Sequence, residues 1–200
     1  MREMIKMAVT LTVLCFISGL LLAALRNGTK DKIEYQELKF VKGPAILDIL
    51  AGASNNPLED RFKLMDGDVE RSFFVGLFDD RDTAMIAFES SGKGYGGDIG
   101  VMAGVTLGDD KISGAGVTTH SETPGVGSRA KTEPGFAAQF KGLDTNQVFK
   151  VKGDGGQVDA LSGATITSRG VAAALTDAGA VYNRLKPRLM AKLKEIRDKR

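Results

Sequence analysis

The chain has 200 residues, of which 42% are hydrophobic, so it can bury the core of one medium-sized domain and carry one appended segment. Its 27 lysines and arginines nearly balance 25 aspartates and glutamates, and the net charge of +2 provides no electrostatic footprint for a nucleic acid partner. The single cysteine, Cys15, excludes an intrachain disulfide and a metal site built from several cysteines.

The first predicted element is an uncharged apolar run, MAVTLTVLCFISGLLLAAL, at residues 7–25. Its length is that of a helix crossing about 30 Å of hydrocarbon, so we predict a single transmembrane helix within an anchor at 1–27. A cleaved signal peptide is the alternative, because Arg2 and Lys6 precede the run. The apolar part of a signal peptide is usually about 7–15 residues long, which favours the anchor. Basic residues on both sides leave the orientation open.

The remaining residues, 28–200, have the composition of a globular domain with a mixed order of helices and strands. Proline and the apolar pattern predict a short helix at 43–52, opened by Pro44, with strands after it. The predicted strands are two within 71–90 around a turn at 79–82, and two at 100–107 and 111–118 joined by a short hairpin turn.

Three further elements complete the predicted domain. They are a helix at 134–143, a last hairpin at 146–161, and a long helix from Arg169 to about Arg197 with a break near Pro187. The fold class is therefore α+β, with an antiparallel sheet flanked by helices. The basic, amphipathic C-terminal residues 184–200 are either a solvated helix end, which we favour, or a surface for a membrane or another protein of a complex.

The stretch DALSGATITS, residues 159–168, places small and hydroxylated residues at the junction with this long helix. Small side chains at 162–164 leave backbone N–H groups accessible at a helix N-terminus, an arrangement that attracts phosphate. A helix cap is the simpler explanation for Thr165, Thr167 or Ser168, but one cap needs only one hydroxyl. The spacing matches neither a Walker loop nor a dinucleotide-binding fingerprint.

The first seven of these residues, DALSGAT, resemble the Asp-x-x-Ser/Thr-Gly-Ala-Thr flavinylation motif of the FMN-binding domain family and match every fixed position. This family includes the G subunit of Rnf complexes and the C subunit of sodium-pumping NADH:quinone reductases. In it, the final threonine, here Thr165, carries FMN through a phosphoester bond that a flavin transferase makes. The resemblance implies covalent FMN at Thr165, with cofactor contacts from Ser162, Gly163, Ala164 and Thr167. Asp159 would position or deprotonate the acceptor; a partly buried turn aspartate is the alternative.

Two other stretches strengthen the resemblance, which extends over essentially the whole chain. GYGGDIGVMAGV, residues 94–105, resembles the family's Gly-Tyr-x-Gly-x-Ile segment, and HSETPGVG, residues 120–127, resembles its His-x-Glu-Thr-Pro-Gly-Leu-Gly loop. Valine replaces the usual leucine in the second loop, which implies a slightly looser contact with the flavin ring. The implied cofactor contacts in these stretches are Tyr95, His120, Glu122, Thr123, Pro124, Gly125 and Val126.

Without the family, these loops have ordinary explanations. Thr-Pro-Gly is a common turn, Tyr95 either stacks on a ligand or fills a gap, and His120, the one histidine, is more often structural than catalytic. Neither metal-ligand spacing nor a nucleophile elbow accompanies His120. We therefore expect no catalytic residues and no metal ligands.

The resemblance implies a membrane-anchored electron carrier with covalent FMN, similar to the G subunit of an Rnf-type, ion-translocating ferredoxin:NAD oxidoreductase. It implies an electron-transfer protein of a larger complex rather than a stand-alone enzyme. Its partners would be the other membrane and peripheral subunits and the flavin transferase, and its FMN domain would lie outside the cytoplasmic membrane. The alternatives are the C subunit of a sodium-pumping NADH:quinone reductase, another anchored flavin carrier, or a non-redox docking scaffold; the short chain favours the Rnf protein.

Overall fold

The computed structural model describes residues 1–78 and 84–198, so the turn predicted at 79–82 lies outside the described residues. The described chain divides into two compact units, Met1–Phe40 and Val41–Arg200, which we treat separately.

The first unit consists of helix α1, Arg2–Gln36, and the start of a π-helical stretch, Glu37–Lys42. None of the residues of α1 is buried, although most of its first half is apolar on all sides. A helix that is hydrophobic all round needs an apolar environment. Helix α1 is long and apolar enough to cross a membrane, and it extends beyond the predicted apolar run at 7–25.

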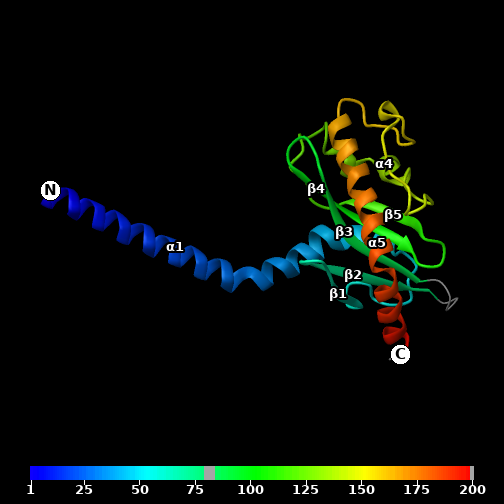
Figure 1. Ribbon diagram of the computed structural model, residues 1–200, viewed down its shortest axis with the longest axis horizontal. Helices are drawn as coiled ribbons and strands as arrows, with labels where there is room; N and C mark the ends of the chain where they lie inside the picture. The colour runs from blue at the N-terminus through cyan, green and yellow to red at the C-terminus, as the bar shows by residue number, and fades with distance from the viewer. Residues whose placement is uncertain (79–83, 199–200) are drawn as a thin grey trace. The chain divides into compact units, whose positions relative to one another are not determined.

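The second unit is built around a five-stranded antiparallel sheet with the strand order β1-β2-β3-β4-β5 (Figure 1). Its strands are β1 Arg61–Asp66, β2 Val69–Leu77, β3 Ala84–Lys93, β4 Asp98–Thr106 and β5 Lys111–Val117. Its helices are α2 Gly43–Ile49, α3 Arg129–Thr132, α4 Pro134–Ala138, the 3-10 turn η2 Lys152–Asp154, and α5 Thr165–Asp198. The predicted α+β class is confirmed, and β2 to β5 form where strands were expected.

The sequence pattern did not indicate β1. Only Leu64 of this edge strand is buried, because its other side chains are exposed or half-buried. An edge strand with one core residue lacks the clear apolar alternation from which a strand is predicted.

The hairpin predicted at 146–161 is wrong. This segment forms a single parallel bridge between Val151 and Val158, around the turn η2, which Gly155 closes with φ +78°. Phe149, Val151 and Val158 alternate with polar residues as in a strand, but they are buried in the unit's core instead of forming a ladder. Alternating apolar residues indicate only that one side of a segment is buried. Here that side packs against the core of the unit, and within the described chain the segment pairs with no neighbouring strand beyond the single bridge.

The break predicted near Pro187 is also wrong, since α5 continues through this residue to Asp198. Pro187 is exposed, whereas Leu185, Leu189 and Leu193 are buried on the side of the helix that packs on the core. Burial of these three leucines outweighs the hydrogen bond that proline removes. The helix predicted at 134–143 is shorter, because α4 ends at Ala138.

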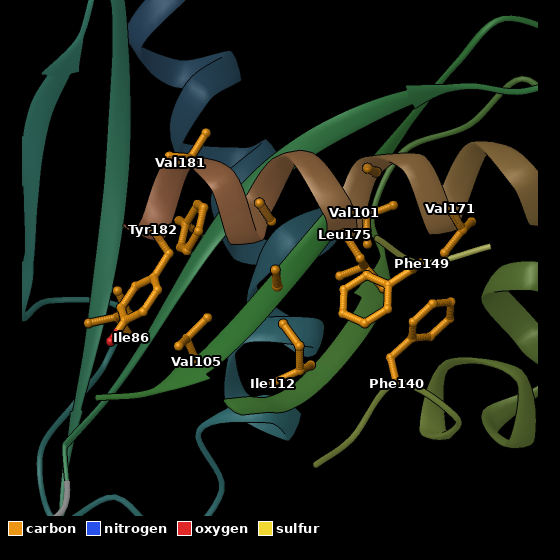
Figure 2. Close-up of a cluster of buried hydrophobic side chains, with 14 of the residues drawn as sticks. Ile86, Val101, Val105, Ile112, Phe140, Phe149, Val171, Leu175, Val181 and Tyr182 are labelled. Atoms are coloured by element: carbon orange, nitrogen blue, oxygen red, sulfur yellow. The ribbon is translucent and has the colours of Figure 1, made fainter. Parts of the chain in front are cut away.

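Helix α5 packs across β3 and β4, and their apolar side chains form the main core (Figure 2). Val171, Leu175 and Val181 of α5 are at most 1% exposed and lie over the sheet. Phe140 and Phe149 close the core edge to face, with ring centroids 5.7 Å apart. The sheet and this one helix therefore contribute most of the buried side chains of this core.

The C-terminal half of α5 is held by a polar contact with the β4–β5 turn. The Tyr182 hydroxyl donates to Asp110 Oδ1 at 2.5 Å, and Lys186 Nζ donates to the same atom at 2.7 Å. Burial and the bond to Asp110 raise the pKa of the Tyr182 hydroxyl, so it remains a donor at neutral pH.

The N-terminal half of α5 approaches β3 through two glycines. A Cβ at Gly170 would lie 2.5 Å from the Lys93 carbonyl oxygen, and a Cβ at Gly92 would overlap the Gly170 carbonyl. Only hydrogen fits between the two backbones at this point. On the opposite face, α2 packs as closely, because a Cβ at Gly104 would overlap the Ile49 side chain.

We expect Gly170→Ala to destabilise the domain by about 2 kcal/mol or more, because the added methyl group would meet backbone that cannot move alone. Helix propensity alone would raise the stability by about 1 kcal/mol, because alanine favours a helix more than glycine does. Denaturant unfolding of the purified protein measures the difference. Gly135→Ala is the control, since nothing lies within 4 Å of its Cβ position; equal stability of the two variants would contradict the proposed close packing.

Candidate functional site

The start of α5 separates the hydroxyls of the DALSGATITS stretch into two groups. Thr167 and Ser168 are buried, with at most 2% exposure, whereas Ser162 and Thr165 are exposed. Ser168 Oγ accepts the Leu161 N–H at 3.0 Å and donates to the Ala164 carbonyl at 3.0 Å. Two of the four hydroxyls therefore serve the fold, and the other two face solvent.

Thr165 is the first residue of α5. Its hydroxyl takes part in no hydrogen bond within the part of the chain that the structure describes, so it does not cap the helix. The turn before it is tight, since Gly163 has φ +78° and the Ala164 N–H donates to the Leu161 carbonyl at 2.9 Å. Thr165 is thus an accessible hydroxyl held at a helix N-terminus, where N–H groups favour an anion.

Glu122 is the buried polar centre of the site, with 6% of its surface exposed. Its Oε1 accepts the Gly96 N–H at 2.8 Å, and its Oε2 accepts the Thr167 hydroxyl. Its own N–H donates to His120 Nδ1 at 3.3 Å. The Glu122 carboxylate therefore joins the tyrosine-containing loop, the Thr-Pro-Gly loop and the first turn of α5. His120 holds the backbone of Glu122 through the bond to its N–H.

The glycines around Glu122 leave room for nothing larger than hydrogen. A Cβ at Gly127 would overlap Glu122 Oε2 and lie 2.8 Å from Thr167 Oγ1, while a Cβ at Gly94 would overlap Glu122 Oε1. The glycines of both loop motifs thus make space for the carboxylate. This packing explains why glycine rather than alanine occupies these two positions.

Exposed apolar side chains surround this centre. Tyr95 is 73% exposed, Ile166 47% and Val126 41%. Val126 lies beside the turn before Thr165, because its Cγ1 is 3.9 Å from the Cβ position of Gly163. The remaining residues of its turn, 123–125, are exposed as well. An apolar surface next to an accessible hydroxyl fits a flat aromatic ligand attached there.

The turn that carries Val126 is internally bonded. Gly125 has φ +72°, and its N–H donates to Ser128 Oγ at 2.8 Å, while the Val126 N–H donates to the Thr123 carbonyl at 3.2 Å. Its shape therefore comes from hydrogen bonds within the turn itself.

Asp159 is exposed, so the alternative of a partly buried turn aspartate is wrong. Its carboxylate pairs with Lys152 at 2.7 Å, and its backbone N–H donates to Gln139 Oε1 at 2.7 Å. The ion pair is a solvent-exposed one that contributes little to stability. A role for Asp159 in positioning the acceptor hydroxyl stays a prediction.

Two arginines that the motifs did not indicate lie close to the DALSGATITS stretch. Arg129 Nη1 donates to the Ser162 carbonyl at 3.2 Å, and Arg169, one helical turn after Thr165, binds both oxygens of Asp154 at 2.7 Å. The hydrogen bond from Arg169 lowers the pKa of the Asp154 carboxyl. Arg129 follows the Thr-Pro-Gly loop closely in sequence, but only the fold shows which carbonyl it reaches.

An open groove of about 620 Å³ lies along α5, apart from the predicted cofactor contacts. It runs along α5 from Arg169 to Ala180 and is lined by Val148, Phe149, Lys150, Val151, Asp154, Arg169, Ala172, Ala173, Thr176, Asp177 and Ala180. None of the predicted cofactor contacts lines it. Among residues 1–78 and 84–198, no cluster of three histidine, cysteine or carboxylate side chains could hold a metal ion.

Comparison with known proteins assigns the chain to a family. Residues 94–180, which include every predicted cofactor contact, match the FMN-binding domain family. The G subunit of the ion-translocating oxidoreductase complex of Pseudomonas aeruginosa is 30% identical over 95% of this chain and 94% of that protein. Its Methanosarcina acetivorans counterpart is 32% identical over 88% of this chain and 93% of that protein. The chain belongs to this G-subunit family.

A solved structure supports the fold of this family member. The crystal structure of Shewanella oneidensis NqrC matches the chain with a TM-score of 0.50 and 27% identity, over 70% of this chain and 72% of that one. The predicted resemblance is therefore confirmed, and the protein carries an FMN-binding domain. Attachment of FMN to Thr165 stays a prediction.

We expect Gly127→Ala to lower the stability of the protein by about 1–3 kcal/mol, because the methyl group would displace Glu122 or Thr167, both buried. Gly153→Ala is the matched control, since its Cβ position has no neighbour within 4 Å. Denaturant unfolding compares the two variants. A Gly127→Ala protein as stable as the control would show that this junction tolerates a side chain.

Proposed function

We propose that this protein is a membrane-anchored electron carrier that holds FMN covalently, through a phosphoester at Thr165, within an Rnf-type ferredoxin:NAD oxidoreductase. One observation carries the assignment of the acceptor. Thr165 has the exposed, unbonded hydroxyl at the α5 N-terminus, whereas Thr167 and Ser168 are buried and bonded. The flavin, when bound, supplies the one- and two-electron redox chemistry.

The residues present fit both parts of FMN. The first N–H groups of α5 and the Arg129 guanidinium, which already reaches the Ser162 carbonyl, would hold the charge of the phosphoester. Tyr95, Val126 and Ile166 offer exposed apolar surface to the ring system. Because this surface is open, the ring would remain accessible to a neighbouring redox protein of the complex.

Covalent attachment suits a domain outside the cytoplasm. A site there cannot be refilled from cytoplasmic FMN, and a tethered cofactor has no route of dissociation. A flavin transferase would need access to its acceptor without unfolding the domain, and the exposure of Ser162, Gly163 and Thr165 allows it.

The proposed topology has residues 1–27 as a single-pass anchor and 28–200 as the FMN-binding domain outside the cytoplasmic membrane. Support comes from the apolar helix that begins at Arg2 and from relatives named as subunits of ion-translocating complexes. Electrons from cytoplasmic ferredoxin would then cross the bilayer through other subunits before reaching this one.

Two alternatives are less well supported. The relatives that align over most of their length are named as G subunits of ion-translocating oxidoreductases, which favours this assignment over the C subunit of a quinone reductase. A docking scaffold without redox function would use Thr165 as a helix cap, but its hydroxyl makes no capping bond among the described residues.

We expect Thr165→Val to fold normally and to carry no covalent FMN, because valine keeps the shape of an exposed side chain but lacks the ester oxygen. Mass spectrometry of protein produced together with its flavin transferase would show the loss of the adduct, and thermal unfolding would show an unchanged midpoint. Thr132→Val, at another exposed threonine, should keep the adduct. An adduct on the Thr165→Val protein, or one mapped to Thr167 in the native protein, would sink the assignment.

We expect cysteines at two exposed turns, Asp68→Cys and Asp109→Cys, to react with a membrane-impermeant thiol reagent in intact spheroplasts. The native cysteine is first removed by Cys15→Ser. Glu3→Cys lies before the apolar run at 7–25, on the side that the proposed topology places in the cytoplasm, and should react only after lysis. Labelling of the two domain positions only after lysis would place the domain in the cytoplasm.

A further inference from the structure

Glu122 differs from the other predicted cofactor contacts of the Thr-Pro-Gly loop because it is buried. Its carboxylate accepts hydrogen bonds from Gly96, 26 residues before it, and from Thr167, 45 residues after it. The four residues that follow it, 123–126, are all exposed. Glu122 therefore lies beneath the surface that the loop presents.

Both oxygens of this carboxylate already have partners from the chain. Oε1 binds a backbone N–H and Oε2 binds a hydroxyl, while the missing side chains at Gly94 and Gly127 leave space for these oxygens alone. A ligand could reach them only by displacing one of the segments. Direct contact with a flavin is thus a poor explanation of Glu122.

The position of Glu122 relative to α5 favours a strong bond. Thr167 is the third residue of α5, so the carboxylate lies at the helix end where unpaired N–H groups favour negative charge. Hydrogen bonds to an ionised group are stronger than those between neutral groups, and the difference is larger where water is excluded. The three segments therefore meet at one buried, charge-assisted junction.

We propose that Glu122 is a positioning residue that locks the loop at 94–97 and the turn at 123–127 onto the first turn of α5. It thereby holds the turn of Val126 and the loop that carries Tyr95 at the start of α5 before any cofactor is attached. This inference rests on the proposed attachment of FMN at Thr165. The lock also engages the Thr167 hydroxyl, so that of the two threonines at the helix start only Thr165 has an unbonded hydroxyl among the described residues.

The first test measures amide hydrogen exchange in the full-length protein, with Thr165→Val present throughout so that no variant carries FMN. Glu122→Ala and Thr167→Val should each speed exchange at Gly96 by about tenfold or more, because they break the junction that protects it. Asp177→Ala is the control, since it removes an α5 carboxylate that accepts the Ser90 hydroxyl at 2.6 Å, away from the site.

The second test restores Thr165 and measures how fast the transferase attaches FMN, from flavin fluorescence in denaturing gels. Glu122→Ala and Thr167→Val should slow attachment by about tenfold or more, in parallel with the exchange result. Thr167→Ser keeps the donor hydroxyl, and Glu122→Gln keeps the shape and can bond both partners. These two conservative variants should retain most of the native rate.

The outcomes separate this inference from the proposed function. Unchanged exchange at Gly96 in both Glu122→Ala and Thr167→Val would overturn the lock. Slow attachment without faster exchange would also overturn it, since Glu122 would then act as a direct ligand, and so would a failure of Thr167→Ser to restore the rate. Persistent FMN on the Thr165→Val protein would refute the attachment site, while the exchange data would still decide the role of Glu122.

Discussion

The backbone contact between Gly92 of β3 and Gly170 of α5 determines the geometry on which the site depends. Because neither residue has a side chain, the helix can lie directly on the end of the strand, which fixes the first turn of α5 over the sheet. The apolar core below α5 then holds its later turns. A helix start that is fixed in this way can present a hydroxyl in a defined direction, which a loop of the same sequence could not.

The site itself combines rigid and exposed parts. Thr165 and Ile166 are exposed on α5, and the other exposed groups belong to two loops that a buried carboxylate connects to this helix. Such a division is expected of an electron carrier, because the cofactor surface must be open to partners while its supporting shell stays ordered. The groove along α5 is a separate feature, since none of the predicted cofactor contacts lines it.

Sequence patterns predicted the elements whose own pattern of apolar residues matches the way they are buried in the fold. The interior strand β4 is buried almost throughout, which makes it easy to recognise, whereas β1 was missed because Leu64 is its one buried residue. Phe149 and Val158 alternate like strand residues but are buried in the core, so the predicted hairpin was wrong. The motifs located Glu122, but its junction joins residues 26 and 45 positions away, and no local pattern contains that information.

The phase of the helix explains how one threonine becomes accessible while its near neighbour does not. At about 3.6 residues per turn, two positions along an α-helix point roughly 200° apart, so Thr165 and Thr167 must face opposite sides of α5. Gly170 and Val171 lie on the buried side with Thr167, and this assigns Thr165 to the solvent side. Residues four apart share a side, which places Arg169 above Thr165. The same rotation that buries the core residues of α5 therefore leaves a hydroxyl and a guanidinium together on the exposed face.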